Sequence, residues 1–157
     1  MLPILCLAAS MPAVGQARAA VRSFRERMRE RILYGSDVKQ AEKPASQMRL
    51  ARADIEARQA EGLLREVVRE VLELRDGASV ADRARWAAAA AMAVDQSRRV
   101  LRSIAEASGA SAHFQHHPLQ RAVRDANMAG CHVVFDLDAR LEIHGRTLLG
   151  LEPNGLI

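Results

Sequence analysis

The stretch SVADRARWAAAAAMAVDQSRRVLRSIAEASG, residues 79–109, decides the fold. It opens with Ser79 and Asp82 in the spacing of a capping box, which is typical of a helix start, and Gly109 is a typical helix stop. In between, apolar residues recur three, four or seven positions apart, which predicts a helix with one face in a protein core. These residues are Ala87, Ala90, Val94, Leu101 and Ile104. The run of alanines inside the stretch would allow a neighbouring helix to approach closely.

Two long helices are predicted before this stretch. The first spans about Pro12 to Leu33 and is followed by Gly35, and the second spans about Pro44 to Arg75, with a proline suited to its first turn. Both carry an apolar stripe with helical spacing. The stripe of the first is Val14, Ala17, Val21, Phe24, Met28 and Ile32, and that of the second is Leu64, Val67, Val68, Val71 and Leu74.

One further helix is predicted to run from Pro118 to Leu148. Its stripe is Leu119, Ala122, Ala126, Ala129, Val133, Leu137, Leu141 and Leu148. Four long amphipathic helices joined by short loops predict an all-α fold, an antiparallel four-helix bundle. We therefore divide the chain into an N-terminal segment (residues 1–11), the bundle domain (residues 12–150) and an irregular tail (residues 151–157). Bundles of this kind often bury a further face against a copy of themselves, so we expect a homo-oligomer, a dimer or a tetramer.

The composition supports helix and argues against a nucleic-acid partner. Hydrophobic residues make up 49% of the 157 residues and aromatic residues only 3%, so the apolar mass is mainly alanine and aliphatic residues, which favour helix. The net charge is +4, but basic residues alternate with acidic ones, as in RERMRER (residues 25–31). No basic run is joined to aromatic stacking residues, so we expect no nucleic-acid binding.

The apolar run at the N-terminus, residues 1–17, could be either a secretion signal or the start of a buried helix. It lacks a preceding basic residue and Pro3 interrupts it, which favours a buried helix start over a secretion signal. The run is also too short to span a membrane.

Cys6 and Cys131 match no metal or redox spacing, which fits a reducing compartment. We expect a cytoplasmic protein without a membrane partner.

The stretch HPLQRAVRDANMAGCH, residues 117–132, holds the candidate chemistry. On a continuous helix, Asp125, His132 and Asp136 are seven and four residues apart and would share a face. A carboxylate one turn from an imidazole can fix its tautomer and raise its basicity, as a general base requires. From spacing alone, a solvated or core-edge histidine is the more common outcome.

The remaining histidines carry weaker signals. His113, His116 and His117 lie in a predicted loop, but their spacing does not match a closed zinc site, so we expect no metal. His144 falls near the apolar stripe of the last helix and is expected to serve packing.

Several motifs together resemble the C-terminal helical domain of the acyl-CoA dehydrogenase superfamily. RERILYG (residues 29–35) is followed, twelve residues after Gly35, by QMRLA (residues 47–51), like the RxxFG and QxxLA motifs of that family. SGASA (108–112), PLQRAVRD (118–125) and HGRTLLGLEP (144–153) resemble more specifically its two-component, flavin-dependent monooxygenase branch. The resemblance extends from about Met11 to Pro153 and implies the helical fold of that domain.

The resemblance also implies roles for individual residues. Arg31 matches an arginine that reaches the flavin phosphate, often across a subunit interface, and a guanidinium suits phosphate oxygens. Gly109 and Ala110 match a small-residue turn beside the flavin, where backbone must approach closely. Arg121 is a further candidate cofactor contact. With Arg124 and Asp125 it forms the PxxRxxRD helix start, for which a structural set of ion pairs is an equally good interpretation.

His132 matches the active-site base of the oxygenase branch, which deprotonates a phenol, and Asp136 or Asp125 would orient it. Many acyl-CoA dehydrogenases instead place a catalytic glutamate after the Arg-Asp helix, where this chain reads CHVVFD (residues 131–136). The resemblance therefore implies a monooxygenase that uses reduced flavin, FMN or FAD, with O2 to hydroxylate an aromatic or related small molecule. A flavin reductase would be its partner.

Family enzymes carry an N-terminal helical domain and a β-domain ahead of this bundle. We therefore expect this chain to be the C-terminal domain alone, with a separate chain as a candidate source of the missing domains. The first alternative is a non-catalytic oligomerisation module or split-enzyme subunit. The second is an acyl-CoA dehydrogenase-type oxidation of thioesters.

Overall fold

A computed structural model describes all residues except Met1, Ser36, Arg75 and Asp76. Its five α-helices are α1 (Leu2–Glu30), α2 (Pro44–Leu74), α3 (Val80–Ser108), α4 (Pro118–Gly130) and α5 (Leu137–Leu148). Three short 3-10 helices join them: η1 (Gln40–Glu42), η3 (Ala110–His113) and η4 (Val133–Phe135). The described residues form no strand beyond an isolated bridge between Ile32 and Lys39. The all-α fold and the bundle are confirmed.

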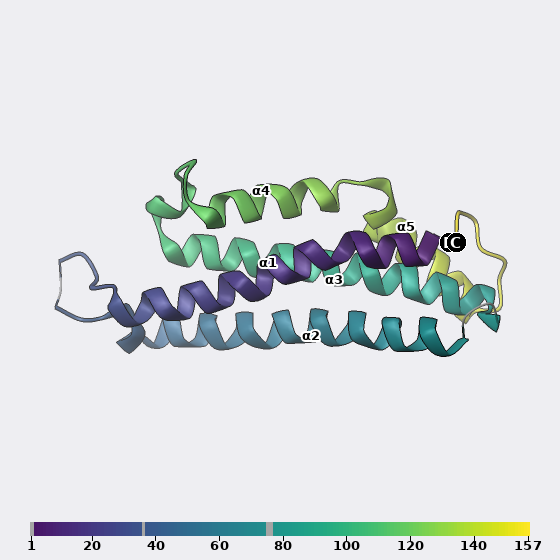
Figure 1. Ribbon diagram of the computed structural model, residues 1–157, viewed down its shortest axis with the longest axis horizontal. Coiled ribbons are helices and arrows are strands. Elements are labelled where there is room, and N and C mark those ends of the chain that lie inside the picture. The colour runs from purple at the N-terminus through teal and green to yellow at the C-terminus, as the bar shows by residue number, and fades with distance from the viewer. Residues whose placement is uncertain (1, 36, 75–76) are drawn as a thin grey trace.

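The helix α3 is the centre of the bundle. The long helices α1, α2 and α3 lie side by side, while α4 and α5 follow one another along α3 (Figure 1). Every residue of the predicted α3 stripe is buried, and so are all the alanines from 87 to 91. The predicted capping box is also confirmed, since Ser79 Oγ accepts from the Asp82 N–H at 3.1 Å and Asp82 Oδ2 accepts from the Ser79 N–H at 3.0 Å. Small side chains therefore let four helices pack around one.

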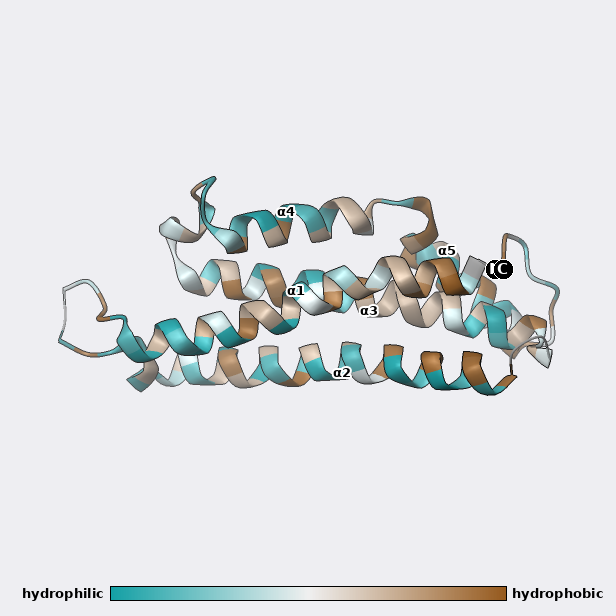
Figure 2. Ribbon diagram, in the orientation of Figure 1, coloured by the Kyte–Doolittle hydropathy of each residue, from teal (hydrophilic) through white to brown (hydrophobic). Residues whose placement is uncertain are grey.

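The helix α1 begins ten residues earlier than the sequence predicted, at Leu2 instead of Pro12. Its buried stripe extends to Cys6, Leu7 and Ser10, whereas Ile4 and Leu5 are more than half exposed. Figure 2 shows how apolar this half of the helix is. By length and composition alone the segment Pro3–Glu30 could cross a membrane, but 44% of its apolar window is buried inside the bundle. The prediction of a buried Ile32 is wrong, because the helix ends before it.

The single helix predicted from Pro118 to Leu148 is wrong, because the chain turns at residues 131–136. The turn buries Phe135, which a continuous helix would place opposite the predicted stripe, and burying a phenylalanine stabilises by about 1.5–3 kcal/mol. Asp136 then caps α5 by accepting from the Ala139 N–H at 3.2 Å. Three residues of the predicted stripe are consequently exposed. They are Val133, Leu141 and Leu148.

The predicted stripe of α2 is only partly buried. Leu64 and Val67 are buried and Leu74 is 40% exposed, which corrects its assignment to the core. The predicted end of this helix at Arg75 lies outside the described residues. The tail, residues 151–157, has no regular structure.

Candidate functional site

A hollow of about 520 Å³ lies where the α4–α5 turn packs on α3. The turn contributes His132 and Asp136, and α3 contributes Asp95 and Arg98. The remaining lining is mostly apolar and consists of Val94, Gly130, Cys131, Val133, Phe135 and Leu137. The structure thus brings two of the three predicted catalytic residues to one cavity, through a turn and not through a shared helix face.

The backbone of the turn holds the His132 imidazole. Nδ1 of His132 accepts a hydrogen bond from the Val134 N–H at 3.3 Å. A neutral imidazole carries one N–H, so an accepting Nδ1 places the proton on Nε2. The exposed ring then presents a donor and not a lone pair, and proton abstraction by Nε2 would require the ring to release Val134.

The predicted arrangement of Asp125, His132 and Asp136 on one helical face is wrong. His132 and Asp136 are caps of the 3-10 turn and of α5, and neither lies inside a helix. Asp125 lies on α4, where it pairs with Arg121 at 3.5 Å and Arg124 at 3.4 Å. The ion-pair interpretation of these three residues therefore describes their contacts, while a cofactor role for Arg121 stays a prediction.

Arg98 was not singled out from the sequence. Its side chain crosses Gly130, where an added Cβ would come within 2.5 Å of the guanidinium, and its Nε donates to Asn127 at 3.2 Å. The sequence does contain the glycine that lies beside Arg98 in the structure, Gly130, but a glycine near a helix end indicates only a helix stop. In the structure, the absence of a side chain at Gly130 lets Arg98 lie along the wall of the hollow.

A second group of polar residues lies at the other end of α4, and we name Arg27, Arg31, Gly109, Ser111 and His117 the end cluster. Arg31 Nη1 donates to the Ser108 carbonyl at 2.9 Å. Gly109 has φ 76° and ψ −172°, and an added Cβ would lie 3.2 Å from Arg31 Nη2. The structure therefore brings together two of the four residues predicted to bind the cofactor, Arg31 and Gly109, and a third, Ala110, follows at the start of η3.

The end cluster has more donors than acceptors. Arg27 donates to Ser111 Oγ at 2.7 Å and lies 3.3 Å from Nε2 of His117, whose Nδ1 accepts from the Leu119 N–H at 3.1 Å. Burial lowers the pKa of His117, and the charge of Arg27 lowers it further. No carboxylate of the described chain forms an ion pair with Arg27 or Arg31. Two guanidinium groups, a hydroxyl and close backbone suit the oxygens of an anion such as phosphate.

The two sites are separated by the length of α4. This helix has 13 residues, so its ends are about 20 Å apart at 1.5 Å per residue. A molecule that contacts both the hollow and the end cluster would therefore have to be about 20 Å long.

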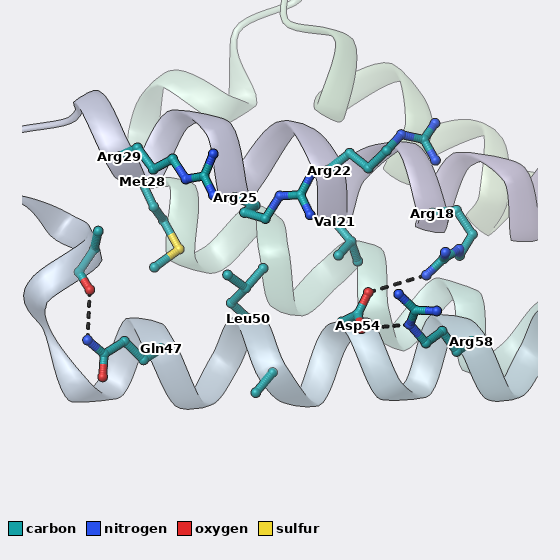
Figure 3. A pocket seen from close by; sticks show the side chains of 12 residues that line it. Arg18, Val21, Arg22, Arg25, Met28, Arg29, Gln47, Leu50, Asp54 and Arg58 are labelled. Atoms are coloured by element: carbon teal, nitrogen blue, oxygen red, sulfur yellow. Dashed lines mark hydrogen bonds and ion pairs between the residues drawn. The ribbon is translucent and has the colours of Figure 1, made fainter.

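A groove between α1 and α2 is lined by arginines (Figure 3). Its single carboxylate, Asp54, pairs with Arg18 at 3.3 Å and Arg58 at 2.8 Å. Three further arginines of α1 form no ion pair with any described residue, namely Arg22, Arg25 and Arg29. This face of the bundle therefore carries uncompensated positive charge. Each pair of like charges three or four positions apart on a helix lowers the stability of the helix by about 0.2–0.5 kcal/mol.

Comparison with known proteins identifies a family. The model of the family "Acyl-CoA dehydrogenase, C-terminal domain" matches residues 7–137. The oxygenase component of an FADH(2)-dependent resorcinol hydroxylase from Rhizobium sp. (strain MTP-10005) is 33% identical over 96% of this chain and 39% of that protein. A pigment production hydroxylase from Rhodococcus sp. (strain ATCC 21145) is 32% identical over 88% of this chain and 36% of that protein. The chain thus spans less than half the length of these relatives.

Two solved structures are similar to this chain along nearly its whole length. The HsaA monooxygenase from M. tuberculosis superposes with a TM-score of 0.86 and 26% identity, over 98% of this chain and 40% of that one. XiaF from Streptomyces sp., solved with FADH2 and glycerol, gives a TM-score of 0.92 at 21% identity, over 99% of this chain and 40% of that one, which shows the shared fold.

Proposed function

Because the chain belongs to the acyl-CoA dehydrogenase C-terminal domain family, we propose that it forms the helical domain of a flavin-dependent monooxygenase that hydroxylates an aromatic or related small molecule. The observation that carries this proposal is the 33% identity, along 96% of the chain, to the oxygenase component of a resorcinol hydroxylase. The chain spans 39% of that relative. We therefore propose that the other walls of the flavin site come from residues outside this sequence, in the same polypeptide or in a separate chain.

The end cluster fits the phosphate of FMN or FAD. Arg31, Arg27 and the Ser111 hydroxyl would hold the phosphate oxygens, and Gly109 would let the backbone approach them. A reduced flavin, when bound, would supply the two electrons needed for one atom of O2 to enter the substrate and the other to leave as water. Since the end cluster is one helix length from the hollow, we propose that it serves a flavin held mainly by a neighbouring subunit. A flavin reductase would deliver the reduced cofactor.

We propose that the hollow binds the aromatic substrate. Val94, Val133 and Phe135 offer an apolar surface to an aromatic ring, and His132 lies beside them. With Nδ1 held by Val134, the Nε2–H of a neutral His132 would donate to a phenolate oxygen and favour the ionised substrate. A base role follows if the imidazole releases Val134 when substrate binds. Before substrate binds, we propose that the backbone of the turn orients the imidazole, in place of the predicted carboxylates.

Flavin titration tests the proposal. Oxidised and reduced FMN and FAD are titrated into the purified chain, its Arg31→Ala variant and its Arg29→Ala variant, with calorimetry and flavin fluorescence as readouts. Arg29 lies two residues before Arg31, near the end of α1 in the arginine-lined groove, so its variant removes an equal charge outside the end cluster. We expect Arg31→Ala to weaken binding about tenfold or more, or about 1.4 kcal/mol, and Arg29→Ala to leave it unchanged. Equal affinities of the three proteins would contradict the proposed role of Arg31.

A second candidate function, a helical oligomerisation module, is favoured by the exposed apolar side of α1. Ile4, Leu5 and Met11 are 54%, 59% and 50% exposed. Contiguous exposed apolar surface often marks an interface. We expect sedimentation velocity to show a dimer or tetramer that dissociates in the double variant Ile4→Glu/Leu5→Glu. A monomer at all concentrations would argue against this module.

A further inference from the structure

Arg140 of α5 is a buried arginine without a carboxylate partner among the described residues. Only 6% of its surface is exposed. Its Nε donates to the Val134 carbonyl at 3.1 Å, and its Nη1 donates to the Leu156 carbonyl at 2.7 Å. Burying a charge is costly unless its hydrogen bonds are made, and a hydrogen bond to a charged group is stronger than one between neutral groups. The guanidinium therefore ties the α4–α5 turn to the tail.

Val134, whose carbonyl is held by Arg140, is also the residue whose N–H holds His132. Its carbonyl accepts from Arg140, and the N–H of the same residue donates to Nδ1 of His132. The turn is further closed by the Phe135 N–H, which donates to the His132 carbonyl at 2.8 Å. The orientation of the imidazole in the hollow thus depends on a residue that is buried behind the turn and does not touch the hollow.

We propose that Arg140 is a positioning residue that fixes the backbone of Val134 and, through it, the orientation and tautomer of the His132 imidazole. The geometry also makes the tail part of this support, since the second acceptor of Arg140 is the Leu156 carbonyl. The catalytic meaning of the arrangement rests on the proposed function, whereas the arrangement itself is measurable without flavin or substrate.

Arginine suits this position because its planar fork reaches two backbone segments at once. A lysine ammonium could donate to the Val134 carbonyl or to the tail, but its point charge does not reproduce the fork. A methionine would fill similar space without donating. These two substitutions therefore separate the packing of the stem from the hydrogen bonds of the head.

The experiment compares Arg140→Met and Arg140→Lys with the control Arg146→Met by NMR of the full chain. Arg146 lies on the same helix and also holds the tail, through a 2.8 Å hydrogen bond from Nε to the Glu152 carbonyl, but it makes no hydrogen bond to the turn. Amide exchange is followed at Val134 and, as a measure of global stability, at Leu101 in the buried face of α3. The imidazole 15N signals of His132 are read at about pH 9, where histidine is neutral, and a His132→Gln variant identifies them.

We expect Arg140→Met to speed exchange at Val134 about tenfold more than at Leu101. The His132 signals should move toward those of an unconstrained imidazole, with both tautomers in exchange. Arg140→Lys should restore part of both effects, and Arg146→Met should produce neither. The proposal is wrong if Arg140→Met changes Val134 and Leu101 exchange in parallel and leaves the His132 signals in place. If Arg140→Met does not fold, the same comparison with Arg140→Lys decides.

These outcomes are independent of the proposed function. Loss of flavin binding or of hydroxylation would leave the exchange and tautomer results unchanged. Conversely, an unmoved His132 in Arg140→Met would remove the positioning role even in an active monooxygenase.

Discussion

At the residue scale, Gly109 occupies a backbone conformation that is almost exclusive to glycine. Its φ of 76° and ψ of −172° fall in a region that costs other residues about 1–3 kcal/mol. The same residue gives Arg31 room to lie against the turn. The backbone and the arginine therefore constrain each other at the end cluster.

Gly109→Ala should lower the free energy of unfolding by about 1–3 kcal/mol, because the new Cβ meets both the strained backbone and Arg31. Gly62→Ala is the matched control. Gly62 lies inside α2 with no atom within 4 Å of an added Cβ, and alanine there should stabilise by about 1 kcal/mol. Urea unfolding of both variants measures the difference, and a Gly109→Ala protein as stable as the parent would refute the strain argument.

At the element scale, α2 and α3 are joined by a carboxylate with two partners. Glu70 of α2 accepts from the buried Trp86 indole N–H at 2.6 Å and from Arg85 at 2.6 Å. The hydrogen bond with Arg85 is the first cause that lowers the pKa of Glu70, and the Trp86 hydrogen bond adds to it. The contact fixes the register of the two helices near the capping box of α3.

Glu70→Leu should cost about 1–3 kcal/mol, because it leaves the buried Trp86 N–H without an acceptor. Glu70→Gln keeps one acceptor and should cost less. The chain has a single tryptophan, so its fluorescence during urea unfolding reports directly on this contact. A Glu70→Leu variant with unchanged stability would mean that the indole N–H finds water or another acceptor.

Sequence reasoning predicted helices better than it predicted the ends of helices. The α3 stripe and its capping box follow from local pattern, and both were correct. The α4–α5 turn was missed because Leu119, Ala126 and Leu137 keep helical spacing across it. Asp136 was interpreted as a site residue because an N-cap aspartate and a catalytic aspartate look alike in sequence. Only the burial of Phe135, a tertiary effect, decides between one helix and two.

The site was predictable only in part. Arg31 and Gly109 were paired through the family resemblance, since nothing in their spacing of 78 positions brings them together. Arg98 was missed because a glycine near a helix end, such as Gly130, indicates only a helix stop, and Arg140 was missed because it has no sequence signal. From the sequence alone, a buried arginine that donates to backbone carbonyls cannot be distinguished from a surface arginine on a helix.

At the scale of the whole molecule, two half-buried histidines make stability depend on pH. Burial is the main cause that lowers the pKa of both His117 and His144, and nearby arginines lower it further. Nδ1 of His144 is buried without a hydrogen-bond partner. A lowered pKa in the folded state means that the unfolded chain binds more protons below its ordinary histidine pKa of about 6.5. The stabilisation is therefore complete above that value and is lost as the pH falls through the folded-state pKa.

We expect the free energy of unfolding to fall as the pH drops below the ordinary histidine pKa of about 6.5. His144→Leu should make this decline shallower. His113→Leu, at the exposed end of η3, should leave it unchanged. Urea unfolding at several pH values gives the slopes, and identical slopes for the parent and His144→Leu would contradict the contribution of that residue.

The alanine-rich centre of α3 also bears on how the sequence can evolve. Because α1, α2, α4 and α5 all pack against this helix, added bulk has no open side toward which to relax. Saturation mutagenesis from Ala87 to Ala91 should therefore rank substitutions by side-chain volume, with glycine and serine tolerated ahead of leucine although leucine is the more hydrophobic. On the exposed positions of α2 the ranking should follow helix propensity and charge. The domain would thus accumulate sequence change mainly on its outer helices, around a central helix restricted to small residues.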